Sequence, residues 1–142
     1  MKNVVIVGTG TMAAGIAAGF ISQSVPITIL GRNKEKSTAC LKKAILLSKK
    51  IGISGANADK DDIELEVSQN HGELSSWQNW DQSQWIIETV AEDMPLKREV
   101  FKQLDKKVPA HIPIGSNSSG FPISKIADGL KTANRMLGAL YF

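Results

Sequence analysis

A glycine-rich turn near the amino terminus is the first feature of this sequence that could do chemistry. Residues 8–13, Gly-Thr-Gly-Thr-Met-Ala, match the pattern G-x-G-x-x-A. The first glycine permits a tight turn, the second lets the backbone approach a pyrophosphate, and the third small residue allows a helix to pack closely on a strand. The following helix would offer free N–H groups and the positive end of its dipole to the phosphates. A plain structural turn is the alternative interpretation. The residues expected to hold a dinucleotide are Gly8, Thr9, Gly10, Thr11 and Met12.

The segment that follows the second expected strand bears on which dinucleotide binds. NAD-binding proteins usually carry an acid there for the ribose 2′-hydroxyl, whereas a nearby arginine accommodates the 2′-phosphate of NADP. Here the residues are Gly31-Arg32-Asn33-Lys34, and the first carboxylate is Glu35. The missing acid favours NADP(H), with Arg32 as the phosphate ligand. The alternative is a solvated Arg32 in a loop.

The elements that must position these residues follow from hydrophobic patterning. Residues 4–7 and 27–30 are continuously apolar, as in strands buried on both faces of a parallel sheet. Between them, residues 12–21 form an alanine-rich helix, with Gly15 and Gly19 expected to let it lie close to the sheet. Strand, glycine turn, helix and strand make a right-handed βαβ unit.

The rest of the chain continues this alternation. A helix over residues 34–50 has one lysine-rich face and one apolar face, and a helix from Pro95 to about Asp105 has Asp93 as its expected N-cap. Strands are expected at 63–67, 85–90, 112–115 and 135–142, a connector with a short helix at 71–84, and a short helix at 123–130. The expected apolar helix positions are Cys40, Leu41, Ala44, Ile45, Leu47 and Ile51, then Leu96, Val100, Phe101 and Leu104. The fold class is a doubly wound, mainly parallel α/β/α sandwich of Rossmann type, in one domain over residues 1–142.

Composition excludes several other classes of protein. A net charge of +3 and a pI near 9.0 are too mild to indicate a nucleic-acid binder. The single cysteine, Cys40, excludes an intrachain disulfide and a multi-cysteine metal site, which fits a reducing compartment. No apolar run approaches the roughly 20 residues of a membrane span. The stretch up to Phe20 is broken by glycines, unlike a signal peptide. We expect a cytoplasmic protein with no metal, nucleic-acid or membrane partner.

Three stretches of the sequence resemble the N-terminal domain of the L-3-hydroxyacyl-CoA dehydrogenases. They cover nearly the whole chain, and residues 49–83 match least well. The stretches are residues 5–12 with 15–17; residues 86–93 with Lys97, Val100 and Phe101; and residues 115–119 continuing through Arg135, Gly138, Tyr141 and Phe142.

The resemblance implies roles for individual residues. Glu92 and Lys97 match family residues that contact NAD, and the alternative for them is a surface ion pair at a helix start. Ser119 matches the serine between the nicotinamide and the 3-hydroxyl or 3-keto group of the substrate, and Asn117 would shape that loop. The lysine face of the 34–50 helix lies where family members contact coenzyme A, although a solvated face is equally consistent with the charge pattern. The lysines concerned are Lys42, Lys43, Lys49 and Lys50, of which Lys49 and Lys50 are the expected substrate contacts.

The sequence also departs from the family pattern. The family places its catalytic histidine two residues after Gly138, where this sequence has Leu140, and leucine can neither accept nor donate a proton. His71 and His111 lie outside the motif and are expected to be ordinary surface or turn residues. The carboxylate partner of the family histidine and the helical domain for substrate and dimerisation would lie beyond residue 142. We therefore expect a fragment of a homodimeric enzyme of fatty acid metabolism, with little turnover of its own.

Two other functions remain open at this point. Leu140 favours a catalytically silent dinucleotide-binding module. A β-hydroxyacid or 6-phosphogluconate type dehydrogenase would share the fold and an arginine after the second strand, but such enzymes lack the Ser-Asn-Ser-Ser sequence found at residues 116–119.

Overall fold

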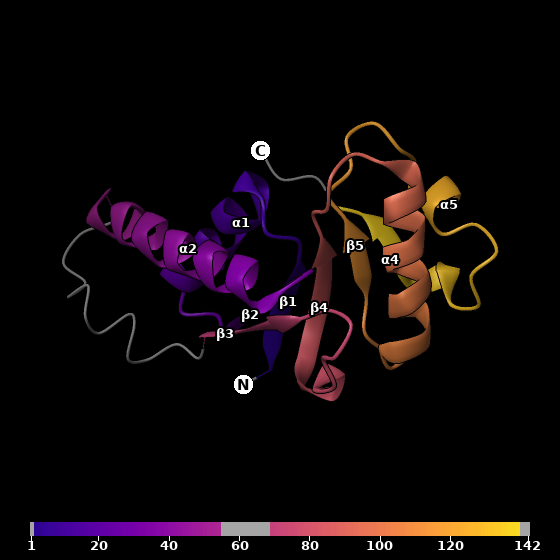
Figure 1. Cartoon of the computed structure of the whole chain (residues 1–142), viewed down its shortest axis with the longest axis horizontal. Helices are drawn as coiled ribbons and strands as arrows, with labels where there is room; N and C mark the ends of the chain where they lie inside the picture. Colours follow the sequence, from indigo (N-terminus) through magenta and orange to yellow (C-terminus); the bar gives the residue numbers. More distant parts are fainter. Residues whose placement is uncertain (1, 55–68, 140–142) are drawn as a thin grey trace.

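The architecture is a six-stranded sheet in which every pairing is parallel. The computed structural model describes residues 2–54 and 69–139, and Figure 1 shows their arrangement. The strand order is β3-β2-β1-β4-β5-β6. The strands are β1 (Asn3–Val7), β2 (Ile27–Gly31), β3 (Gln69–Glu73), β4 (Ser83–Glu88), β5 (Ile114–Ser116) and β6 (Met136–Gly138). This order confirms the predicted doubly wound fold of Rossmann type.

Helices cover both faces of the sheet. The α1 helix (Thr11–Ser22) and the α2 helix (Lys34–Ser54) pack against one face of the sheet, and α4 (Met94–Lys107) and α5 (Ile123–Ile126) pack against the other (Figure 1). Alternate residues of β1 enter different cores: Val4 and Ile6 pack with α1 and α2, whereas Val5 and Val7 pack with α4. Because both faces are buried, the strand is apolar from Val4 to Val7. Two short 3₁₀ helices, η1 (Trp80–Gln82) and η2 (Ala133–Arg135), complete the described elements.

The close packing of α1 on the sheet comes from its alanines. Ala13, Ala14, Ala17 and Ala18 have no exposed surface. The expectation for Gly15 and Gly19 was wrong, because a Cβ at either position would meet nothing within 4 Å. These two glycines face away from the sheet, and it is the small alanine side chains that let the backbones approach.

Several predicted boundaries differ from the structure. The strand β3 lies partly inside the segment 71–84 that was expected to be a connector, while the strand expected at 63–67 lies outside the described residues. The strand β4 ends at Glu88 rather than Val90, and α5 ends at Ile126, where the chain turns through Gly129 at φ +79°. The last strand is limited to Met136–Gly138, with residues 140–142 outside the described part.

Two residues expected on apolar helix faces are exposed instead. Ile51 is 42% exposed and Leu96 is 37% exposed. In α4 the buried face consists of Val100, Phe101 and Leu104 together with Lys97. In the first turn of α4, Lys97 is therefore buried where the apolar periodicity predicted that the neighbouring Leu96 would be buried.

An arginine fixes the carboxyl end of α4 to the last described segment. The Arg135 guanidinium donates to the carbonyl oxygens of Pro109 at 2.6 Å, Ile112 at 3.0 Å and Val108 at 3.0 Å. Beside it, the Asp105 carboxylate accepts from the backbone N–H of Thr132 at 2.9 Å and from its hydroxyl. These bonds satisfy carbonyl groups at the helix end and hold β6 in place beside β5. Among the described helices, none has both the length and the apolar character needed to cross a membrane.

Candidate dinucleotide site

The strand order reverses between β1 and β4, and ligands of open α/β sheets bind at such a switch point. Because all the strands are parallel, their carboxyl ends share one edge of the sheet. Three loops meet at this edge: the glycine turn at 8–10, the β4–α4 loop at 89–93 and the β5–α5 loop at 117–122. The backbone N–H of Thr89 donates to the Val7 carbonyl oxygen at 2.8 Å, and that of Asn117 donates to the Glu88 carbonyl oxygen at 2.8 Å. The loops are thus joined directly to their neighbouring strands.

The glycine turn has the geometry that a pyrophosphate requires. Gly8 has φ +129°, and a Cβ there would lie 2.3 Å from Thr89 Oγ1, so only glycine fits. Gly10 is exposed, and a Cβ there would meet nothing within 4 Å. Gly10 also gives α1 no side-chain cap, and the first turn of α1 contains no acid. The N–H groups of that turn therefore face the crevice without a side-chain acceptor, as an anion site needs.

The end of β2 is crowded rather than acidic. Gly31 is buried, and a Cβ there would lie 2.5 Å from Thr9 Cγ2 and 2.8 Å from Ser37 Oγ. Ser37 cannot move without cost, because its hydroxyl donates to the Gly72 carbonyl oxygen at 2.8 Å. Arg32 is exposed, and the Asn33 side chain accepts from Lys36 N at 2.9 Å at the start of α2. A side chain at position 31 would therefore require Thr9 and Ser37 to shift.

Lys97 and Glu92 are paired, but Lys97 is not at the surface. The Lys97 side chain is 1% exposed, and its ammonium lies 2.7 Å from Glu88 Oε2 and 3.1 Å from Glu92 Oε1. It also donates to the Val90 carbonyl oxygen at 3.0 Å. The interpretation as a surface ion pair was therefore wrong for Lys97, while Glu92 remains 45% exposed.

Glu88 lies in one of the stretches that resemble the family, but the sequence analysis gave it no role. It is the last residue of β4 and has no exposed surface. Its Oε1 accepts from Ser116 Oγ at 2.6 Å, and its Oε2 accepts from Val90 N at 2.7 Å and from Lys97. A buried carboxylate is tolerated when its oxygens are bonded in this way. The available signal was a carboxylate directly after the apolar residues Trp85, Ile86 and Ile87 of the strand.

Glu92 connects the two loops beside the switch point. Its Oε2 accepts from Ser118 Oγ at 3.0 Å and from Gly120 N at 3.2 Å. Its partial burial acts to raise the pKa, but hydrogen bonds from Lys97, Ser118 and Gly120 hold the pKa of Glu92 below its ordinary value. Glu92 is therefore an anion at neutral pH. The loop that it holds contains Ser119, which is exposed, and Asn117, which is half-buried.

The other candidate residues are placed apart from this loop. Lys42, Lys43 and Lys50 are exposed on α2, and Lys49 is half-buried. Lys49 and Lys50 lie in the second half of that helix, and Lys49 is roughly 22 Å along the axis from Lys34, its first residue. His71 is half-buried in β3 rather than in a turn, and His111 is exposed before β5. Leu140 lies outside the described residues.

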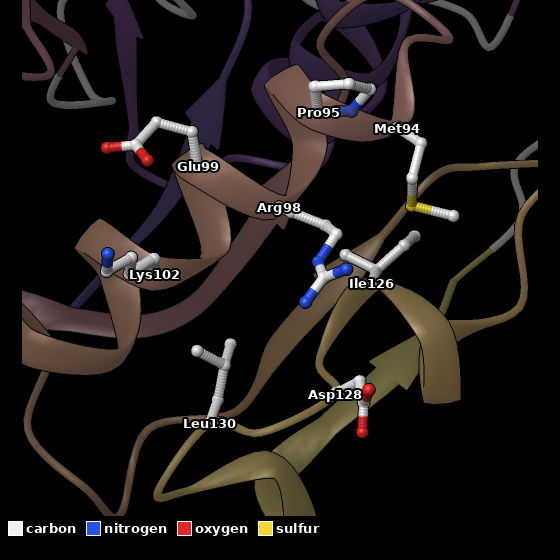
Figure 2. Close-up of a pocket in the computed structure, with 8 residues that line it drawn as sticks. All are labelled: Met94, Pro95, Arg98, Glu99, Lys102, Ile126, Asp128 and Leu130. Atoms are coloured by element: carbon white, nitrogen blue, oxygen red, sulfur yellow. The ribbon is translucent and has the colours of Figure 1, made fainter.

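Two hollows lie near the β5–α5 side of the molecule. One, of about 560 Å³, is lined by residues 118–123 and Gly138, so it adjoins Ser119. The other, of about 380 Å³, lies between α4 and residues 126–130; Figure 2 shows the Arg98 side chain reaching from α4 toward Ile126 and Asp128. This second hollow includes none of the predicted site residues. In the described ranges, no group of three histidine, cysteine or acidic side chains could hold a metal ion.

Comparison with known proteins decides the family. The profile of the family described as "3-hydroxyacyl-CoA dehydrogenase, NAD binding domain" matches residues 3–142. The chain belongs to this family. The predicted resemblance is confirmed over its whole length, and the cofactor named for the family is NAD.

Individual members of the family show the same relationship. A probable 3-hydroxybutyryl-CoA dehydrogenase of Bacillus subtilis is 28% identical over 97% of this chain and 47% of its own length. The peroxisomal multifunctional protein MFP2 of Arabidopsis thaliana is 29% identical over all of this chain and 19% of its own length. The crystal structure of FadB2 from M. tuberculosis superposes with a TM-score of 0.84 at 27% identity, over 100% of this chain and 50% of that one. The chain thus spans half or less of the length of these relatives.

Proposed function

We propose that this chain is the cofactor-binding part of an enzyme that transfers hydride between a nicotinamide dinucleotide and a 3-hydroxyacyl-CoA. The observation that carries the proposal is the uncapped start of α1 beyond Gly8 and Gly10, placed at the switch point beside the loop of Ser119. Membership in a dehydrogenase family supports it. The nicotinamide ring, when bound, supplies the hydride chemistry.

Different loops of the chain would bind different parts of the dinucleotide. Backbone N–H groups at the start of α1 would hold the pyrophosphate, the residues after β2 would bind the adenosine half, and the loops after β4 and β5 would bind the nicotinamide half. The Ser119 hydroxyl, which is exposed beside the 560 Å³ hollow, would bond the 3-hydroxyl or 3-keto oxygen. The hollow itself is a site for part of the acyl-CoA.

We propose further that NADP(H) binds at least as well as NAD(H). Gly31 leaves no acid for the ribose 2′-hydroxyl, and a side chain at this position would have to displace Thr9 Cγ2 and Ser37 Oγ. Arg32, the next residue, is exposed, and its guanidinium could form a charge-assisted hydrogen bond with a 2′-phosphate. A titration of the protein with NADH and NADPH, followed by nucleotide fluorescence, tests both statements. Binding of NADH alone would contradict the role of Arg32, and binding of neither would contradict the function.

A catalytically silent dinucleotide-binding module is the second candidate, and Leu140 is the observation that favours it. Oxidation of an alcohol needs a base, and leucine cannot supply one. The discriminating assay follows NADH or NADPH absorbance with acetoacetyl-CoA, for the unmodified protein and for Leu140→His. Turnover that appears only in the variant supports a lost base and a silent module. Turnover by the unmodified protein supports the enzyme.

A further inference from the structure

The hollow between α4 and residues 126–130 has an apolar floor that belongs to the core. Its volume is about 380 Å³, near the lower end of the range for small-molecule sites, roughly 300–1,000 Å³. Ile126 is buried, and Met94 and Leu130 are half-buried. All three pack in the core cluster that contains the buried face of α4. The hollow therefore offers a fixed apolar surface to the side chain of a small ligand.

Charged side chains of both signs surround this floor. Arg98 and Lys102 line the hollow from α4, about one helical turn apart, and Asp128 lines it from the opposite wall. Figure 2 shows Arg98 reaching toward Asp128, while the Glu99 carboxylate points away from both. In the part of the chain that the structure describes, none of these four side chains has an ion-pair or hydrogen-bond partner. Both kinds of charge are thus available to a ligand.

The presence of both charges indicates the class of ligand. A simple anion would attract Arg98 and Lys102 but would also lie beside the Asp128 carboxylate. A simple cation would pair with Asp128 but would lie beside the two positive side chains. Unpaired like charges disfavour both of these ligands. A zwitterion avoids the conflict, because its carboxylate can accept two parallel N–H bonds from Arg98 while its ammonium donates to Asp128.

We propose that this hollow binds an α-amino acid with an aliphatic side chain. The carboxylate is held by Arg98, the ammonium by Asp128, and the side chain packs on Met94, Ile126 and Leu130. The site is separate from the proposed dinucleotide site, because no residue of the loops at 8–10, 89–93 and 117–122 lines it. The proposal goes beyond the proposed function and does not depend on it.

L-leucine is the probe, and two analogues each lack one of its charges. 4-Methylpentanoate has no ammonium, and 3-methylbutylamine has no carboxylate. Calorimetric titration of the unmodified protein measures the dissociation constants of all three compounds. Each analogue loses a hydrogen bond between charged groups, so each should bind at least about tenfold more weakly than L-leucine.

Two substitutions assign the charges to residues. Arg98→Gln should weaken L-leucine binding about tenfold but should not weaken binding of 3-methylbutylamine, which has no carboxylate to lose. Asp128→Asn should weaken L-leucine binding by a similar factor but should not weaken binding of 4-methylpentanoate. Lys125→Gln is the matched control, because this exposed lysine of α5 does not line the hollow. Arg98 and Asp128 are also exposed, so all three variants should keep their melting temperature.

The outcomes separate this inference from the proposed function. It is overturned if L-leucine shows no saturable binding, if 4-methylpentanoate binds as tightly as L-leucine, or if Arg98→Gln and Lys125→Gln bind L-leucine equally well. None of these results affects the dinucleotide site, which is tested by titration of the same protein with NADH and NADPH. If L-leucine bound as expected and neither nucleotide did, the proposed function would fail and the amino-acid site would stand.

Discussion

The two ends of the proposed dinucleotide site, one after β2 and the other after β4 and β5, are stabilised by different contacts. At the β2 end, Gly31 is crowded by Thr9 and Ser37, and the next residue, Arg32, is exposed. At the β4–β5 end, the buried pair Glu88 and Lys97 anchors a loop network. On the proposed function, the first end would select between NAD and NADP through the absence of an acid, whereas the second would hold its loops in place through buried contacts. A change at the first end should therefore alter preference among ligands, and a change at the second should alter the fold itself.

The largest expected effect is that of Lys97→Ala on stability. Removal of the cation leaves Glu88 charged and unpaired in the interior, which costs about 3–5 kcal/mol. Lys102→Ala, on the same helix but exposed, should change the free energy of unfolding by less than about 0.5 kcal/mol. Urea unfolding followed by circular dichroism measures both. If Lys97→Ala were as stable as Lys102→Ala, the β4–β5 end would not be the anchored one.

Gly31→Asp tests the crowding at the β2 end. The Cβ would meet Thr9 Cγ2 at 2.5 Å and Ser37 Oγ at 2.8 Å, so overpacking should destabilise the protein by about 1–3 kcal/mol. Adding Thr9→Ala should recover part of that loss by removing the nearer methyl group. Thermal unfolding of the single and double variants gives the comparison. A single variant as stable as the starting protein, and newly selective for NADH, would show that the corner has room for an acid.

These two positions also show what the sequence could reveal. The strand, glycine turn and helix at 3–22 were predictable because each is specified by neighbouring residues. The absence of an acid at position 31 was also evident from the sequence, because it depends only on which residue follows the second predicted strand. The burial of Lys97 could not be predicted in this way. Its partner Glu88 is nine residues away, and the two meet only because α4 packs against the sheet that contains β4. The strand β3 escaped notice because Gln-Asn-His-Gly-Glu is polar, and its pairing with β2 is a tertiary contact.

Arg32→Ala should change nucleotide preference without changing the fold. The side chain is exposed, so its removal leaves stability within about 0.5 kcal/mol. Loss of a charge-assisted bond to the 2′-phosphate should weaken NADPH binding about tenfold and leave NADH binding unchanged. The ratio of the two dissociation constants is the measurement, and Lys36→Ala on α2 is an exposed cationic control. An equal loss for both nucleotides would remove the specific role of Arg32.

The smallest expected effect is a loss of stability in acid. Partial burial acts to raise the pKa of Asp105, but hydrogen bonds from Thr132 and Lys131 lower it below the ordinary value, and the pKa of Glu92 is also lowered. A carboxylate with a lowered folded-state pKa stabilises the protein above its unfolded pKa, and that contribution disappears as pH falls through the folded value. The free energy of unfolding falls between neutral pH and acid, and Asp105→Asn should reduce that fall by about 0.5 kcal/mol. The effect is small because the carboxylate is partly solvated. Unfolding free energies at neutral pH and below the usual carboxyl range give the result, and an unchanged pH dependence would contradict it.

The central claim is that a pyrophosphate rests against bare backbone at the start of α1, and Gly10→Ala tests it most directly. Gly10 has φ −82°, which alanine adopts readily, and the new Cβ would meet no protein atom within 4 Å. The variant should therefore keep its melting temperature while losing affinity for NADH and NADPH alike by at least about tenfold, because the methyl group occupies the approach of the phosphates. Gly15→Ala, exposed on α1 and equally free of contacts, is the control. Undiminished binding of both nucleotides by Gly10→Ala would contradict the account.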